Sequence, residues 1–104
     1  MKNLLFQEIE VGDLIFDYSP SHNWCQLGVI TRTTEHMVYA RFVYSMENGR
    51  KIKSKYALKV DEQTVLDYIQ GLEEMEIPHT EFINLNKMIL NLWKSMKIEE
   101  ENAR

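Results

Sequence analysis

One short pattern in this sequence contains side chains that are able to do chemistry. His22 and Cys25 have a spacing found in metal sites, and His36 and His79 are the other two histidines. A structural zinc site usually takes four ligands in two closely spaced pairs, and the chain holds one such pair. As a nucleophile, Cys25 would require a positioned base, for which His22 is the nearest candidate. We expect no metal, and we interpret His22 as a loop residue and Cys25 as a partly buried one.

The sequence motifs of nucleotide-dependent enzymes and of hydrolases do not occur in this chain. It contains no Walker loop, no glycine-rich dinucleotide fingerprint and no nucleophile elbow. Glu73, Glu74 and Glu76 have the spacing of a solvated helix face. With 104 residues, the chain is also small for an enzyme that has a cofactor domain of its own. We therefore expect a non-catalytic protein that has no cofactor.

Charge is distributed unevenly along the chain. The formal net charge is −4, yet residues 28–60 hold seven Lys and Arg against two Glu. Residues 1–27 carry a balance of −3 and residues 61–104 a balance of −6. A basic segment in an acidic chain predicts an anion-binding surface, and nucleic acid or a ribonucleoprotein is the first candidate partner. Lysines that alternate along an edge strand also prevent pairing with other chains, which is the alternative interpretation.

Six residues are the candidate nucleic-acid contacts. We expect the basic side chains to bind phosphates and the tyrosine to stack on a base. These residues are Arg32, Tyr39, Arg41, Lys51, Lys53 and Lys55.

The elements that position these residues divide the chain into two halves. Residues 1–60 are rich in Val, Ile, Tyr, Phe and Thr, which is typical of strands, whereas the pattern from Asp61 onward is helical. We expect an α+β fold in a single domain over residues 1–104, with a sheet region over 1–60 and a helical extension over 61–104. The expected strands cover residues 14–18, 27–33, 37–45 and 50–56. The expected helices follow Asp61, as an N-cap, and begin near Thr80.

The last hairpin has a register that burial can decide. Val38, Ala40, Phe42, Tyr44 and Met46 share one face of the third strand, and all are apolar. A two-residue Asn48-Gly49 loop would place lysines opposite them. A three-residue loop with Gly49 in the left-handed conformation instead pairs Tyr44 with Ile52 and Phe42 with Ser54. We therefore predict this second register, with the lysines on the outer face.

The strand half resembles small SH3-like barrels of the KOW and Tudor kind. The resemblance rests on Val11-Gly12-Asp13-Leu14-Ile15, on Gly28-Val29-Ile30, and on an aromatic-rich strand followed by an Asn-Gly hairpin. It covers roughly residues 9–60 and leaves out the helices. It implies an N-terminal SH3-like antiparallel β-barrel, and for the KOW kind it implies RNA binding. The composition also resembles that of accessory proteins of large bacteriophages.

The second helix offers a different function. Ile83, Leu90 and Trp93 widen its apolar stripe beyond what one docking surface requires. These residues are candidates for a protein–protein contact, either in a homodimer or with another protein, as in a phage-encoded inhibitor or adaptor. The acidic helices are an alternative contact surface for a basic protein.

Compartment and membrane association follow from cysteine content and hydropathy. One cysteine permits no internal disulfide and favours a reducing compartment. The apolar run of Leu4, Leu5 and Phe6 is too short for a signal peptide. No stretch has the roughly 18–20 apolar residues of a membrane helix. We expect a cytoplasmic protein, in the host cytoplasm if it is viral, with no membrane partner.

Overall fold

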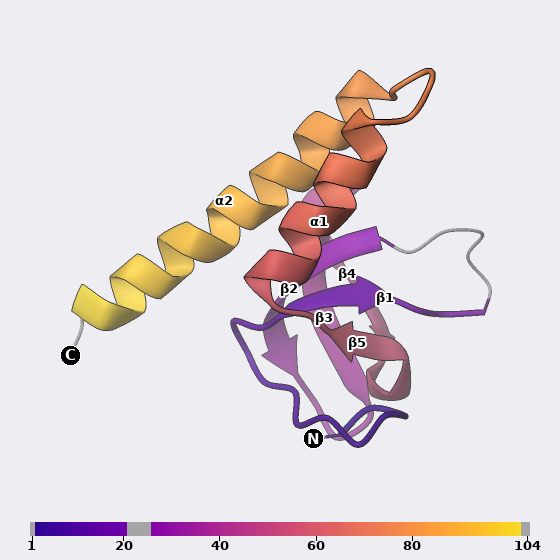
Figure 1. Cartoon of the computed structure of the whole chain (residues 1–104). Helices are drawn as coiled ribbons and strands as arrows, with labels where there is room; N and C mark the ends of the chain where they lie inside the picture. Colours follow the sequence, from indigo (N-terminus) through magenta and orange to yellow (C-terminus); the bar gives the residue numbers. More distant parts are fainter. Residues whose placement is uncertain (1, 21–25, 103–104) are drawn as a thin grey trace.

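The chain forms one antiparallel sheet followed by two helices, which confirms the α+β class (Figure 1). A computed structural model describes residues 2–20 and 26–102. The strands are β1 (Leu14–Asp17), β2 (Gln26–Thr33), β3 (Met37–Phe42), β4 (Ser45–Lys53) and β5 (Ala57–Lys59). A short 3₁₀ helix, η1 (Ser54–Tyr56), lies between β4 and β5, and the α-helices are α1 (Glu62–Glu73) and α2 (Thr80–Asn102). The strand order is β4-β3-β2-β1-β5.

Alternating side chains build a separate apolar core on each face of the sheet. The inner core contains Ile9, Ile15, Ile30, Val38, Ala40, Phe42, Ile52 and Ala57. The outer core joins strand residues to the helices and contains Leu14, Leu27, Val29, Val43, Val65, Ile69, Ile83, Ile89 and Leu90. In Figure 1, α1 and α2 both lie across the same side of the sheet, over β1 and β2. The helices therefore leave much of the outer face of β3 and β4 uncovered, and side chains there are exposed to solvent.

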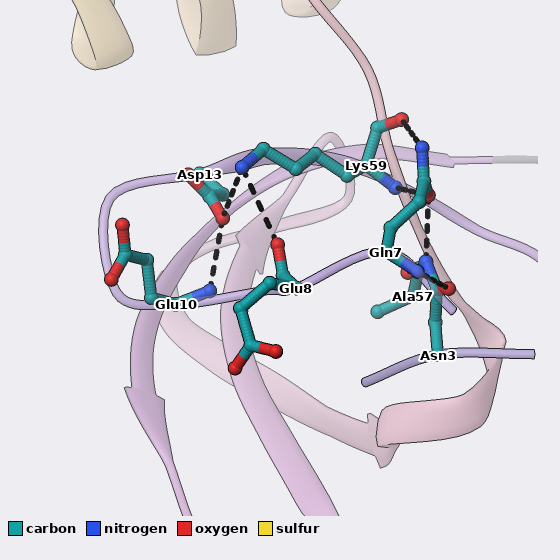
Figure 2. Close-up of polar contacts among 7 residues, drawn as sticks. All are labelled: Asn3, Gln7, Glu8, Glu10, Asp13, Ala57 and Lys59. Carbon is teal, nitrogen blue, oxygen red and sulfur yellow. Dashed lines mark hydrogen bonds and ion pairs between the residues drawn. The ribbon is translucent and has the colours of Figure 1, made fainter. Parts of the chain in front are cut away.

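The sheet does not close into the barrel that we expected. β4 and β5 are its two edges, and the described residues form no ladder between them. The N-terminal segment occupies the free edge of β5 instead (Figure 2). Asn3 Nδ2 donates to Ala57 O at 2.8 Å, and the side-chain amide of Gln7 bonds both the N–H and the carbonyl of Lys59. Side-chain amides thus take the place that a neighbouring strand would have in a closed barrel.

The open sheet is strongly curled, as an ion pair between distant strands shows. Arg50 in β4 donates to Asp17 in β1 at 2.8 Å, although β2 and β3 lie between these strands. A flat sheet would separate β1 from β4 by about 14 Å, three times the usual strand spacing. Asp17 lies on the face of Ile15, and Arg50 pairs directly with Ala40, so both side chains belong to the inner face. The ion pair therefore bridges the concave side of the sheet.

The predicted register of the last hairpin is wrong. Phe42 pairs with Ser45 across a turn at Val43 and Tyr44, while Val38 pairs with Ile52. Residues 46–49 form a bulge in β4 opposite Arg41, and Gly49 has the expected left-handed conformation there, with φ +70°. Tertiary packing moves the turn, because Val43 is buried in the outer core and its N–H donates to Leu27 O. Val38, Ala40 and Phe42 are buried as predicted, but Tyr44 is 56% exposed.

The helix starts agree with the sequence predictions. Asp61 is the N-cap of α1 and accepts a 2.8 Å hydrogen bond from Thr64 N, and hydrogen bonding to Thr64 lowers the pKa of this carboxyl. α2 begins at Thr80. The predicted strand over residues 50–56 ends at Lys53, and the short β5 was not expected. β5 completes the sheet by pairing with β1.

Candidate functional site

The register of β2, β3 and β4 gathers most of the predicted nucleic-acid contacts on one surface. Tyr39 in the middle strand pairs directly with Arg32 on one side and with Lys51 on the other. Directly paired residues share a face of the sheet, and so do residues two positions apart along a strand. Arg41 therefore lies on the same face as Tyr39, and Lys53 lies on the same face as Lys51. The register shift between Ile30 and Arg32 turns Arg32 to this face. We call these five residues, Arg32, Tyr39, Arg41, Lys51 and Lys53, the basic face.

Arg32 and Tyr39 form the only aromatic contact within the basic face. The guanidinium carbon of Arg32 lies 4.0 Å from the centroid of the Tyr39 ring. A cation at this distance over a tyrosine ring is attracted by the electrons of the ring face. The guanidinium therefore covers the surface on which we expected a base to stack. In this arrangement Tyr39 positions Arg32, and the outer plane of the guanidinium is the one that a base can reach.

The cations of the basic face differ from neighbouring cations in their ion pairing. Within residues 2–20 and 26–102, no carboxylate lies within 4.0 Å of Arg32, Arg41, Lys51 or Lys53. Two other cations of the basic segment are neutralised. Arg50 pairs with Asp17 at 2.8 Å, and Lys59 pairs with Asp13 at 3.4 Å. The positive charge of residues 28–60 is thus concentrated on one face of the sheet.

The Asp17 carboxylate is held in its charged form by its partners. Its side chain has no exposed surface. Burial by itself would raise the pKa of Asp17, but hydrogen bonds from Ser19 and the contact with Arg50 outweigh burial and lower it. An ionised Asp17 keeps Arg50 on the inner side of the sheet, away from the basic face.

A recess adjoins the basic face where the β4 bulge leaves the sheet. It has a volume of about 400 Å³, and Arg32, Tyr39, Asn48 and Lys51 contribute to its lining. The bulge places Asn48 in the lining of the same recess as Arg32, Arg50 and Lys51. This combination of fixed positive charge and a neutral hydrogen-bonding group suits a phosphate or a sugar.

Lys55 is separated from the other predicted contacts. We expected it to continue the alternation of Lys51 and Lys53 along a strand, but it lies in η1. Its Nζ is 5.1 Å from the centroid of the Tyr56 ring, and its carbonyl accepts a hydrogen bond from Leu4 N. The turn at η1 ends the strand register, so that Lys55 is not part of the basic face.

The predicted protein-contact residues of the second helix face the core. Ile83 and Leu90 are buried in the outer core, and Trp93 is partly buried against it, with Lys97 Nζ 5.1 Å from its ring. The apolar stripe at these residues packs against the outer core, which covers Ile83 and Leu90 almost completely and Trp93 in part. The exposed apolar side chains of the helices and their connection are Leu66, Met75, Ile77, Met88 and Ile98.

A hollow beside Lys59 is lined by both polar and apolar residues, and some of its charged side chains form ion pairs. It has a volume of about 600 Å³ between the N-terminal segment, the start of α1 and the middle of α2. Lys59 Nζ contacts Asp13 and the carbonyl of Glu8, while Asp13 accepts from Glu10 N (Figure 2). Nearby, Glu62 pairs with Lys94 at 3.1 Å. These contacts join the N-terminal segment to β5 and α1 to α2, and we interpret the hollow as structural.

The expectations about metal binding and about membrane association concern residues outside the basic face. The described residues contain no group of three or more His, Cys, Asp and Glu side chains that could hold a metal ion. His22 and Cys25 lie outside the described residues. In the part of the chain that is described, no helix has the length and apolar character needed to cross a membrane.

Comparison with protein-family models, with curated proteins and with solved structures finds no match to this chain.

Two features of the structure have no local signal in the sequence: the position of Arg50 and the covering of the β5 edge. Arg50 was counted as part of the basic segment, although it faces Asp17 across the inner side of the sheet. Asn3 and Gln7, which cover the edge of β5, gave no local signal. Their partners lie 54 and 52 residues away in the sequence, so that only the folded chain brings them together.

Proposed function

We propose that this protein is a non-catalytic module that binds nucleic acid, alone or in a ribonucleoprotein, through the basic face. The observation that carries the proposal is the concentration, on one face of β2, β3 and β4, of four cations that form no ion pair with the described residues. Arginine and lysine contacts to phosphates supply most of the sequence-independent affinity of nucleic-acid-binding proteins.

The interior position of two of these cations favours binding over edge protection. Lys51 and Lys53 lie on β4, which is an edge strand, so that edge protection alone would explain them. Arg32 and Arg41 lie on β2 and β3, which are paired on both sides and have no free edge to protect. A role that involves all four residues must use the face of the sheet and not its edge.

The geometry of the basic face favours single strands. Lys51 and Lys53 are about 6.7 Å apart along β4, from the usual rise of a strand. The guanidinium of Arg32, held over Tyr39, presents a flat cationic plane on which an unpaired base can stack. Tyr39 acts here as a positioning residue.

The SH3-like resemblance remains part of this proposal, with an open curled sheet in place of a closed barrel. Two observations support the resemblance. The sheet has five antiparallel strands, and Gly28 lies in β2, where the resemblance places a glycine.

Fluorescence anisotropy with mixed-sequence single-stranded RNA and DNA tests the proposal. Four phosphate contacts on a single strand predict a logarithmic salt slope of about −3, or an affinity loss of about 50-fold between 50 and 200 mM salt. We expect the double variant K51E/K53E to lose at least tenfold in affinity.

The matched control is K87E/K94E, which makes the same change in net charge on α2. Lys87 and Lys94 form exposed ion pairs with Glu73 and Glu62, and such pairs contribute little to stability. This control should change the affinity by less than threefold. Absence of binding at 50 mM salt, or an equal loss in both double variants, would contradict the proposal.

A further inference from the structure

An apolar groove lies on the outer side of the molecule between the helices and the β3–β4 turn. It has a volume of about 360 Å³ and is lined by Tyr44, Tyr68, Leu72, Met75, His79 and Phe82. The Tyr44 and Phe82 rings stack with their centroids 6.0 Å apart, and Tyr68 is held edge-on by Phe16 at 5.1 Å. Each of the two groove tyrosines therefore has an aromatic ring as a neighbour.

Apolar side chains around the groove remain open to solvent. Met75 is 49% exposed, and Ile77 in the connection between α1 and α2 is 79% exposed. Tyr44 and Met75 belong to the groove lining, whereas Ile77 is outside the lining and two residues from Met75 in the chain. Clustered exposure of large apolar side chains is typical of surfaces that contact another molecule.

The segment that supplies most of the groove lining is rich in carboxylates, and several of them are direct sequence neighbours of lining residues. Residues 61–81 contain seven Asp and Glu and no Lys or Arg. Glu62 pairs with Lys94, and Glu73 with Lys87. Among the described residues, no cation lies within 4.0 Å of Glu74 and Glu76, which flank Met75, or of Glu81, which precedes Phe82. The groove is therefore an apolar site in a negative field.

We propose that this groove binds a positively charged peptide segment of another protein, with one or two apolar side chains as anchors. The apolar lining recognises the anchors, and Glu74, Glu76 and Glu81 attract the flanking basic residues. The volume is near the lower end of the range for small-molecule sites, which suits side-chain anchors. The same carboxylates repel nucleic acid, so the site is separate from the basic face and does not depend on the function proposed above.

The test uses three fluorescein-labelled synthetic peptides and the full-length protein. The first peptide has adjacent Leu and Phe flanked by lysines, the second has serines in place of Leu and Phe, and the third has glutamates in place of the lysines. We expect saturable micromolar binding of the first peptide, at least tenfold weaker binding of the second, and no binding of the third. Equal binding of the first and second peptides would show attraction by charge alone and would overturn the proposal.

Variants of the protein locate the bound peptide. M75K should weaken binding of the first peptide at least tenfold, because it removes an apolar wall and adds a like charge. E74K/E76K should also weaken it at least tenfold, whereas E99K/E101K, which makes the same charge change near the end of α2, should weaken it less than threefold. All these residues are exposed, and circular dichroism verifies that each variant folds.

Two further outcomes would overturn the proposal. Equal losses in the two glutamate pairs would mean that only net charge matters. Self-association in sedimentation that M75K abolishes would mean that a second copy of this chain occupies the groove.

Unchanged binding of the first peptide by K51E/K53E would show that the groove and the basic face act separately, whatever the result for nucleic acid.

Discussion

The side-chain amide of Gln7 pairs with the main chain of Lys59 through both of its polar atoms. Its Nε2 donates to Lys59 O at 3.3 Å, and its Oε1 accepts from Lys59 N at 3.1 Å (Figure 2). This is the hydrogen-bond pattern that a neighbouring strand would provide. Because β5 is an edge strand of three residues, the amide protects an edge that would otherwise be open to other chains.

Replacement of Gln7 by Glu should open this edge. A carboxylate still accepts from Lys59 N, but it cannot donate to Lys59 O and faces that carbonyl with a negative charge. We expect a loss of about 1–2 kcal/mol in the free energy of unfolding, measured by urea denaturation. Hydrogen exchange of the Lys59 amide should change less than in Gln7→Ala, which removes both bonds. Equal exchange rates in the two variants would contradict this account.

The Asp17–Arg50 pair should make stability depend on pH. Because the pKa of Asp17 is lower in the folded chain than in the unfolded one, the carboxylate stabilises the fold above the ordinary aspartate pKa of about 3.9. This stabilisation is lost as the pH falls through that value toward the lower folded-state pKa. At pH 7, D17N should cost about 3 kcal/mol, since it removes the negative charge of the Asp17–Arg50 ion pair. The difference from the wild type should shrink in urea unfolding near pH 3.5, and a constant difference would refute the linkage.

The buried side-chain amide of Asn86 should lower the free energy of unfolding of the protein. It is fully buried in α2; its Nδ2 donates to Phe82 O at 2.8 Å, and its Oδ1 has no hydrogen-bond partner among the described residues. N86L should raise the free energy of unfolding by about 1 kcal/mol, or Tm by about 4–8 °C. N86D places an unpaired charge at the same site and should lower the stability strongly at neutral pH. A less stable N86L would show that the amide has a stabilising role.

Two glycines should respond to alanine in opposite ways. A Cβ on Gly28 would lie 2.5 Å from Cδ1 of the buried Phe42 and 3.0 Å from the Arg41 carbonyl. G28A should therefore cost about 2–3 kcal/mol through overpacking. Gly71 lies inside α1 with open space around its Cα, so G71A should stabilise the protein by about 0.5–1 kcal/mol. Thermal and urea unfolding measure both changes, and a neutral G28A would mean that Phe42 can move aside.

The sequence by itself determined the elements whose signals are local. Strand-forming residues before Asp61 and helical periodicity after it predict the α+β class, and Asp61 and Thr80 predict the helix starts. The alternation in β3 predicts that Val38, Ala40 and Phe42 are buried, which places Tyr39 and Arg41 outward. These features depend on residues a few positions apart, which share one local geometry.

Only the tertiary structure decided how these elements join. An Asn-Gly pair is a strong turn signal, yet burial of Val43 beneath the helices moves the turn and makes Gly49 part of a bulge. The pairing of Arg50 with Asp17 removes one cation from the basic surface, and Gln7 covers an edge that barrel closure would have covered. Each of these outcomes follows from contacts between residues far apart in the chain. The free energies of these long-range contacts are comparable to those of the local helix, strand and turn preferences. Local sequence patterns alone therefore cannot predict how the elements join.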